Sequence, residues 1–243
     1  MAGPLGRESS RGDPLTRLPG SPSLNGTFWP RVARAYGWWR VSRGLDGLHV
    51  AGLDAFVREV EAGPRLVVAN HVAWWDGVVA SALGHALGLE VRLVARADTL
   101  VHNPWMRQAG VIPLPGGAAL RGCVREVAEF LDRPRRVVWF FPQGRQRPDS
   151  VRPLGFQSGV RLFAGIAPAL PVALAYPFRE VDVPAAMLDV GAPLTDGFEA
   201  DVTARLDRIS AFVEGDPRFV EVVASRRRPQ QRGLAARLLG AAR

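Results

Sequence analysis

The 243-residue sequence contains no lysine, a single cysteine and no long uninterrupted hydrophobic run. One cysteine, Cys123, excludes an intrachain disulfide and a cysteine-based metal site, and we expect it to be a small core residue. Three prolines interrupt the longest apolar stretch, residues 162–178. No segment therefore has the 18 or more apolar residues of a transmembrane helix.

Because lysine is absent, all 31 basic residues are arginines, and the formal net charge is +8. This excess is typical of proteins that work on an anionic surface, either phospholipid headgroups or nucleic acid. Residues 1–26 lack the apolar core of a signal peptide. Because they are rich in Pro, Gly and Ser, we expect them to be disordered. Residues 225–243 read as a basic tail, which leaves one main domain at 46–224.

Apolar runs of strand length alternate with segments of helical periodicity along that domain. Strands are predicted at 48–51, 65–69, 91–95, 111–114, 136–141, 171–175 and 187–190, and helices at 74–87, 97–108, 117–131, 156–164 and 202–212. This order predicts an α/β fold: a mixed, mostly parallel sheet covered by helices on both faces.

An additional amphipathic helix is predicted before the domain, within residues 27–45. Its aromatic and apolar residues share one helical face, and arginines flank that face: Phe28, Val32, Ala35, Tyr36 and Trp39, with Arg31, Arg34 and Arg40. Such a pattern fits a helix at a membrane interface, and it equally fits a helix that packs on the domain.

The most informative stretch is residues 70–76, which follow a predicted strand and lead into a predicted helix. His71 and Asp76 are five positions apart, so they meet only if the chain turns between them. Asp76 would then lie in the first helical turn, where an anion is favoured. A carboxylate on one imidazole nitrogen leaves the other nitrogen as a base that takes a proton from an alcohol. The alternative is a helix-capping aspartate beside a hydrogen-bonded histidine.

The pattern Asn-His-x-x-x-x-Asp of residues 70–76 resembles the first motif of the glycerolipid and lysophospholipid acyltransferase family. That family transfers a fatty acyl group from a thioester to a hydroxyl. Residues 110–114 and 171–174 resemble two further family segments, although Pro115 and Gly116 stand where the former has an arginine. The resemblance covers about residues 45–195 and implies catalytic roles for His71 and Asp76.

A third segment, residues 140–147, resembles the family motif Phe-Pro-Glu-Gly-Thr-Arg, which helps to bind the acceptor. Here Gln143 replaces the Glu, Arg145 the Thr and Gln146 the Arg, while Arg147 follows one place later. The resemblance implies substrate-binding roles for the residues at these two motifs: Asn70, Gln143, Gly144, Arg145 and Arg147. Arg121 and Arg152 are further candidates to replace the missing phosphate-binding arginines.

We therefore expect an O-acyltransferase that uses acyl-CoA or acyl carrier protein as co-substrate, without a metal or other cofactor. The expected acceptor is a lysophospholipid or related glycerolipid, and the expected location is peripheral, at the cytoplasmic face of a membrane. Because the phosphate-binding positions are altered, a glycolipid or glycosylated carotenoid acceptor stays open. A non-catalytic basic protein that binds membrane or nucleic acid also stays open. A serine hydrolase is disfavoured, since Ser158 lacks the Gly-x-Ser-x-Gly spacing.

Overall fold

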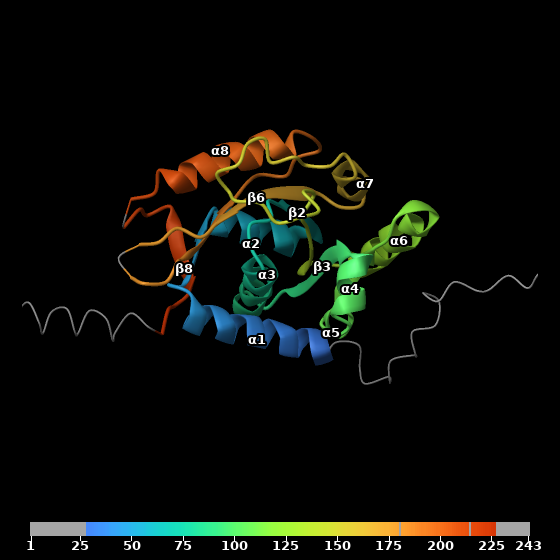
Figure 1. Cartoon of the computed structure of the whole chain (residues 1–243), viewed down its shortest axis with the longest axis horizontal. Coiled ribbons are helices and arrows are strands. Elements are labelled where there is room, and N and C mark those ends of the chain that lie inside the picture. The colour runs from blue at the N-terminus through green and yellow to red at the C-terminus, as the bar shows by residue number, and fades with distance from the viewer. Residues whose placement is uncertain (1–27, 180, 214, 227–243) are drawn as a thin grey trace, which may run out of the picture.

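The computed structural model describes residues 28–226 except residues 180 and 214. A sheet forms its centre (Figure 1). The sheet has eight strands in the order β4–β3–β5–β2–β6–β7–β1–β8. The strands are β1 Leu48–Ala51, β2 Arg65–Ala69, β3 Glu90–Arg96, β4 Val111–Leu114, β5 Arg136–Phe140, β6 Ala169–Ala175, β7 Ala186–Val190 and β8 Phe219–Val223.

Strands β4, β3, β5, β2 and β6 are all parallel to one another. Beyond them, β7 is antiparallel to β6 and parallel to β1, and β8 is antiparallel to β1. The predicted mixed, mostly parallel sheet is confirmed. Its consequence for function is geometric, because the carboxyl ends of five neighbouring strands open onto the same edge.

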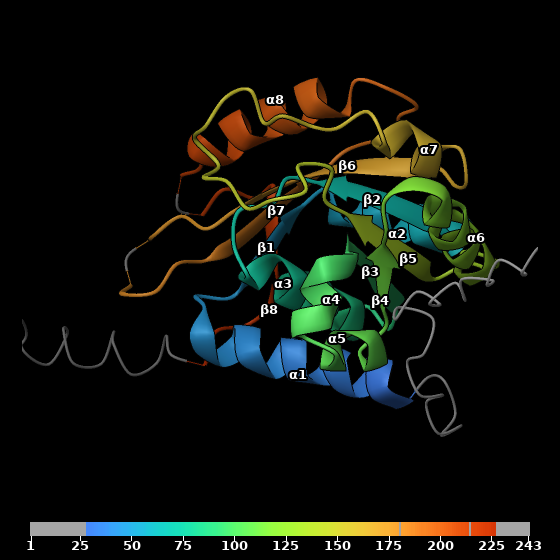
Figure 2. The ribbon, with the colours of Figure 1, turned by 45° about the vertical axis from the view of Figure 1, so that its right-hand side comes forward.

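Helices cover both faces of the sheet, as predicted. Buried residues of α1 Phe28–Gly44, α2 Leu53–Ala62 and α3 Trp75–Ala86 form a core with one face. Those of α6 Leu120–Phe130, α7 Val160–Ala164 and α8 Phe198–Ser210 pack on the other. Figure 2 shows α7 and α8 above the sheet and α1 with α3 below it.

Strand β2 shows why its sequence is apolar throughout. Val67 and Ala69 belong to the core beneath α1–α3, whereas Leu66 and Val68 belong to the core beneath α6 and α7. A strand buried on both faces loses the polar alternation of a half-exposed strand. The same reasoning accounts for β5 and β6.

Several elements differ from the sequence prediction. The predicted helix 97–108 is two helices, α4 Ala97–His102 and α5 Trp105–Gln108, because Pro104 lacks an N–H and disfavours helical geometry at Asn103. Helix α2 and strand β8 were not predicted. A short 3₁₀ turn, Gly117–Ala119, precedes α6, and α7 begins at Val160 rather than at residue 156.

No helix within the described residues combines the length and the hydrophobicity needed to cross a bilayer. The expected disorder of residues 1–26, and most of the expected basic tail, namely residues 227–243, lie outside the described residues.

Candidate active site

The site lies at the edge of the sheet where the parallel strands end. Strand β2 leads into Asn70 and His71, β5 into the turn that contains Gln143, and β6 into Tyr176. Because β5, β2 and β6 are neighbours in this order, the two motifs found in the sequence lie side by side.

Asn70 joins the ends of β2 and β6. Its side-chain amide donates to the carbonyl oxygen of Leu174 and accepts the N–H of the same residue, each over 2.8 Å. The side chain is 1% exposed, so both ends of its amide serve the protein backbone. This differs from the predicted contact with substrate, and it gives Asn70 a supporting position behind His71.

His71 and Asp76 are brought together by the turn before α3. The imidazole Nδ1 of His71 lies 2.6 Å from Oδ2 of Asp76. The aspartate is fully buried, whereas 24% of the His71 side chain is exposed. An ionised carboxylate only accepts hydrogen bonds, so this contact assigns the proton to Nδ1 and leaves Nε2 as an acceptor. The histidine ring also stacks on Phe141, with the ring centroids 4.8 Å apart.

The Asp76 carboxylate is held by three other donors. The backbone N–H groups of Val72 and Ala73 donate to Oδ2 over 2.7 and 3.1 Å. The hydroxyl of Tyr176 donates to Oδ1 over 2.7 Å. Asp76 therefore closes the turn before α3 and pairs with His71, but it does not cap the helix, because α3 has no side-chain cap hydrogen bond at its N-cap residue, Trp74.

The turn after β5 fixes the backbone of His71. The side-chain oxygen of Gln143 accepts the His71 N–H, and the Gln143 amide nitrogen donates to the carbonyl of Leu154 over 3.1 Å. The N–H of Arg147 donates to the carbonyl of His71 over 2.8 Å. Both polar groups of the His71 backbone are thus bonded to this one turn.

Gly144 allows the turn to close. Its φ of +64° lies in the left-handed region that favours glycine, and a Cβ there would lie 3.0 Å from the side-chain nitrogen of Gln157. Beside it is a pocket of about 390 Å³ lined by Arg96, Gln143, Gly144, Arg145, Arg147, Gly155 and Gln157. Four of the five residues predicted to bind substrate line this pocket, and Asn70 is the exception.

The three arginines of the pocket differ in their bonding. Arg147 donates to the carbonyls of Leu154 and Pro153, over 3.0 and 3.4 Å. Arg96 pairs with the exposed Asp98. No protein partner within the described residues binds the Arg145 guanidinium, which is exposed. Arg145 is therefore the arginine most readily available to an anion.

Two residues of this edge were missed by sequence reasoning, Arg96 and Tyr176. Each comes directly after a predicted strand, Arg96 after 91–95 and Tyr176 after 171–175. The ends of the predicted strands could therefore have drawn attention to both residues. Of the suggested substitutes, Arg152 lies elsewhere, 3.6 Å from Asp207. In the part of the chain that the structure describes, no three His, Cys, Asp or Glu side chains converge as a metal site requires.

Comparison with known proteins gives the context for this geometry. The chain resembles a solved structure, the 1-acyl-sn-glycerophosphate (LPA) acyltransferase PlsC from Thermotoga maritima, with a TM-score of 0.52 and 15% sequence identity. That alignment covers 76% of this chain and 81% of the other. No curated protein sequence matches the chain. The family model described as Acyltransferase matches residues 48–174, just over half of the chain, and this range includes His71, Asp76 and Gln143. The chain is thus an enzyme of the acyltransferase family, as the motifs in its sequence predicted.

Proposed function

We propose that the enzyme transfers a fatty acyl group from acyl-CoA or acyl carrier protein to a hydroxyl of a lysophospholipid or related glycerolipid. The observation that carries the proposal is the 2.6 Å contact between His71 and the buried Asp76, beside a pocket lined by arginines. In this proposal both residues are catalytic.

The proposed reaction needs one base and no acyl-enzyme. Nε2 of His71 takes the proton of the acceptor hydroxyl as its oxygen attacks the thioester carbonyl. Asp76 keeps the ring oriented and stabilises the imidazolium that forms. The carbon–sulfur bond then breaks, and the proton passes from His71 to the departing thiolate. The products are an ester and a free thiol.

The arginine pocket is the proposed site for the anionic headgroup of the acceptor. Arg145 is exposed at its rim, and the backbone N–H of Arg147 donates to the carbonyl of His71. The pocket therefore adjoins the turn before α3 that carries His71, which we call the catalytic turn. Arginine suits a phosphate because its guanidinium donates two parallel hydrogen bonds. These arginines would take the place of the family arginines that this sequence lacks.

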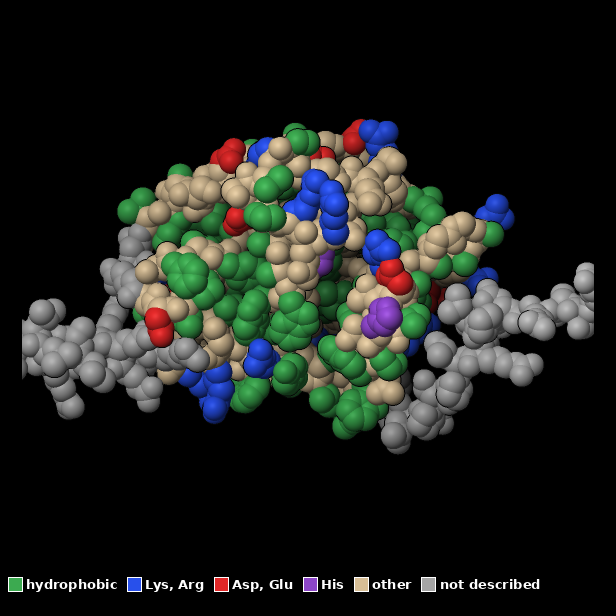
Figure 3. All heavy atoms as spheres, in the orientation of Figure 1, with side chains coloured by type: hydrophobic (Ala, Val, Ile, Leu, Met, Phe, Trp, Pro, Cys, Tyr) green, Lys and Arg blue, Asp and Glu red, His purple; other side chains and the backbone are tan. Residues whose placement is uncertain are grey.

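We further propose that the enzyme acts peripherally at the cytoplasmic face of a membrane, which α1 contacts. Gly37, Val41 and Ser42 are the buried residues of α1, whereas the aromatic face points outward. Phe28, Trp29, Tyr36 and Trp39 are each 42–54% exposed, and so are Val32 on the same face and Trp74 in the catalytic turn. We call these six residues the aromatic surface. Figure 3 shows hydrophobic side chains interspersed with arginines along this side of the molecule.

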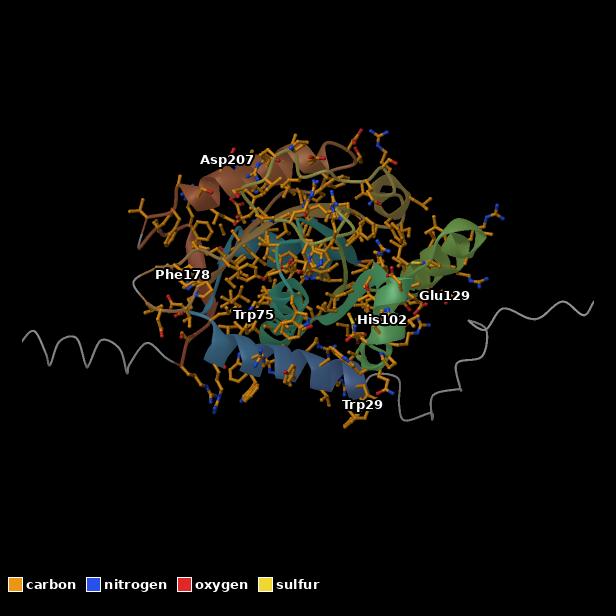
Figure 4. The ribbon with its side chains drawn as sticks, viewed as in Figure 1. Trp29, Trp75, His102, Glu129, Phe178 and Asp207 are labelled. Carbon is orange, nitrogen blue, oxygen red and sulfur yellow. The ribbon has the colours of Figure 1, made fainter. Side chains whose placement is uncertain are left out.

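Arginines complement the aromatic surface. The Arg43 guanidinium lies 5.4 Å from the Trp39 ring, and that of Arg40 lies 5.9 Å from the Trp74 ring. Amphipathic aromatics and arginines are the residues that settle at the interface of an anionic bilayer. Figure 4 shows Trp29 at one end of α1 and Trp75, the neighbour of Trp74, beside the other half of the helix. Membrane contact here would bring lipid to the entrance of the site.

A second acceptor class has a specific observation in its favour. Asp98 already pairs with Arg96, and backbone carbonyls already occupy Arg147, so the pocket offers less free cationic charge than three arginines suggest. A sugar hydroxyl of a glycolipid or glycosylated carotenoid needs less charge compensation than a phosphate monoester.

The test offers two donors, CoA and acyl carrier protein, each carrying a radiolabelled acyl group, and measures thiol release and label transfer. The acceptors are vesicles that contain lysophospholipids, glycerol phosphates or glycolipids. We expect label in one acceptor class, and a loss of about 10²- to 10⁴-fold in His71→Ala. His102→Ala is the matched control, because His102 is an exposed histidine on α4 that makes no contact with the His71–Asp76 pair.

Equal transfer by His71→Ala and wild type would remove His71 from the mechanism. Transfer only to glycolipids would select the second acceptor class. Vesicle or nucleic-acid binding without transfer from either donor would favour a non-catalytic binding protein.

A further inference from the structure

Tyr176 follows directly after β6 and faces the catalytic pair from the neighbouring strand. Its hydroxyl lies 2.7 Å from Oδ1 of Asp76, and its ring packs on the core beneath α1–α3. The three other donors to this carboxylate, among the described residues, all bind Oδ2. Tyr176 is thus the partner of the second carboxylate oxygen.

We propose that Tyr176 is a positioning residue for catalysis, which sets the orientation of Asp76 and, through it, that of His71. The inference rests on the proposed function of the His71–Asp76 pair. It adds a residue that does not contact the reacting atoms and that lies 100 positions from Asp76 in the sequence.

Burial explains why Asp76 needs this donor. The residue is 0% exposed, and a buried carboxylate oxygen without a hydrogen-bond partner is strongly disfavoured. With Oδ1 fixed by Tyr176, and Oδ2 fixed by the turn, the plane of the carboxylate is determined. The imidazole that pairs with Oδ2 inherits this orientation.

The protonation state of Tyr176 suits a permanent donor. Burial, together with the neighbouring negative charge of Asp76, raises the pKa of Tyr176 well above its ordinary value. The ionisable side chains that contact Asp76, within the described residues, are His71 and Tyr176. The phenol therefore keeps its proton wherever the enzyme is folded near neutral pH.

The pairing of β2 with β6 determines where Tyr176 lies. Strands β2 and β6 pair in parallel, with Ala69 opposite Val172, and Asn70 then bonds both backbone groups of Leu174. Residue 176 is two positions further, so its side chain points to the same face as Leu174. That face carries α3 and hence Asp76. Asn70 thus joins the ends of β2 and β6, and Tyr176 joins the end of β6 to Asp76.

The first test is steady-state kinetics of Tyr176→Phe against wild type. We expect kcat to fall roughly 10- to 100-fold with KM changed less than about 2-fold, as for an interaction that matters in the transition state. The acid limb of the pH–rate profile should move to higher pH. The Tyr176 hydroxyl stabilises the negative charge of Asp76, so its loss makes protonation of the His71–Asp76 pair more favourable. Ser210→Ala on α8 is the control, since it removes a hydroxyl that bonds a backbone carbonyl away from the site.

A second measurement uses wild-type protein and needs no acyl transfer. The chain has only two tyrosines, and Tyr36 is exposed on α1. With labelled tyrosine, NMR should show one slowly exchanging phenolic O–H proton that shifts in Asp76→Asn. This reading also serves if Tyr176→Phe does not fold.

The outcomes separate the two proposals. Wild-type protein that transfers no acyl group contradicts the proposed function, whatever the phenolic proton does. An active wild type with an unchanged kcat and pH profile in folded Tyr176→Phe overturns the role of Tyr176 and leaves the proposed function intact. Two freely exchanging phenolic protons overturn it as well.

Discussion

The side chain of Gln143, in the turn after β5, holds the backbone of His71, which follows the neighbouring strand β2. Its oxygen accepts the His71 N–H, while its nitrogen donates to Leu154. The family motif quoted for this position has a glutamate, which when ionised cannot donate. In this enzyme the amide bridges a donor on one side and an acceptor on the other, and it is buried.

Gln143→Ala should therefore reduce both stability and turnover. It leaves the N–H of His71 without its partner, at a cost of roughly 1–3 kcal/mol for a buried group left unsatisfied, whereas the carbonyl of Leu154 keeps its hydrogen bond from Arg147. We expect kcat to fall about 10- to 100-fold, because the base loses one of its two backbone anchors. Chemical denaturation and steady-state kinetics measure the two effects.

Gln108→Ala is the matched control for this change, since Gln108 is an exposed glutamine at the end of α5. It should behave as wild type in both measurements. A Gln143→Ala variant with full kcat would contradict the positioning role of Gln143.

Arg145→Ala tests which arginine binds the acceptor. Because the Arg145 guanidinium is exposed and free of protein partners within the described residues, its loss should change stability little. For a phosphate-bearing acceptor we expect KM to rise about 10- to 150-fold, in line with roughly 1.5–3 kcal/mol for a charged hydrogen bond. Arg125→Ala, on the exposed side of α6, is the control. An unchanged KM for every anionic acceptor would exclude Arg145 from headgroup binding.

The sequence was sufficient for the fold class and for the approach of His71 to Asp76. Uninterrupted apolar strands such as β2 are produced by burial on both faces, and this pattern is local and readable. The spacing of His71 and Asp76 requires a turn, and a strand followed by a helix supplies one. These inferences depend on residues that are close in the sequence.

The parts that sequence reasoning missed depend on strand order. Tyr176 meets Asp76 only because β6 lies next to β2, and Arg96 reaches the pocket because β3 lies next to β5. The family resemblance implied a substrate-binding role for Asn70, and the sequence could not reveal that its amide bonds Leu174, which is 104 positions away. Helix α2 was missed although Phe56 and Val60, four positions apart, form its buried stripe.

Cys123 should resist thiol reagents in the folded enzyme. It is 5% exposed on α6, and burial raises the pKa of its thiol to about 11. The thiolate is the reactive form, so between pH 7 and 9 the folded protein has far less of it than a free cysteine with a pKa of about 8.5. We expect labelling by a maleimide at pH 8 to be at least about 100-fold slower than in denatured protein. Rapid labelling of the native enzyme, with loss of activity, would contradict a purely structural role.

The aromatic surface makes a prediction about membrane binding that is independent of catalysis. In the double variant Tyr36→Ser and Trp39→Ser, two exposed aromatics are lost from α1, and the buried residues that pack on α3 are kept. Burying such a side chain in an apolar environment is worth roughly 1.5–3 kcal/mol, so partial insertion of two should change vesicle affinity about 10-fold or more. Cosedimentation with vesicles of phosphatidylglycerol, compared with phosphatidylcholine alone, measures this affinity and its dependence on anionic lipid.

Phe178→Ser is the matched control, because Phe178 is 72% exposed but lies outside α1. Equal losses in both variants would show that exposed aromatics contribute without regard to position. No loss in the double variant would exclude α1 as the membrane contact.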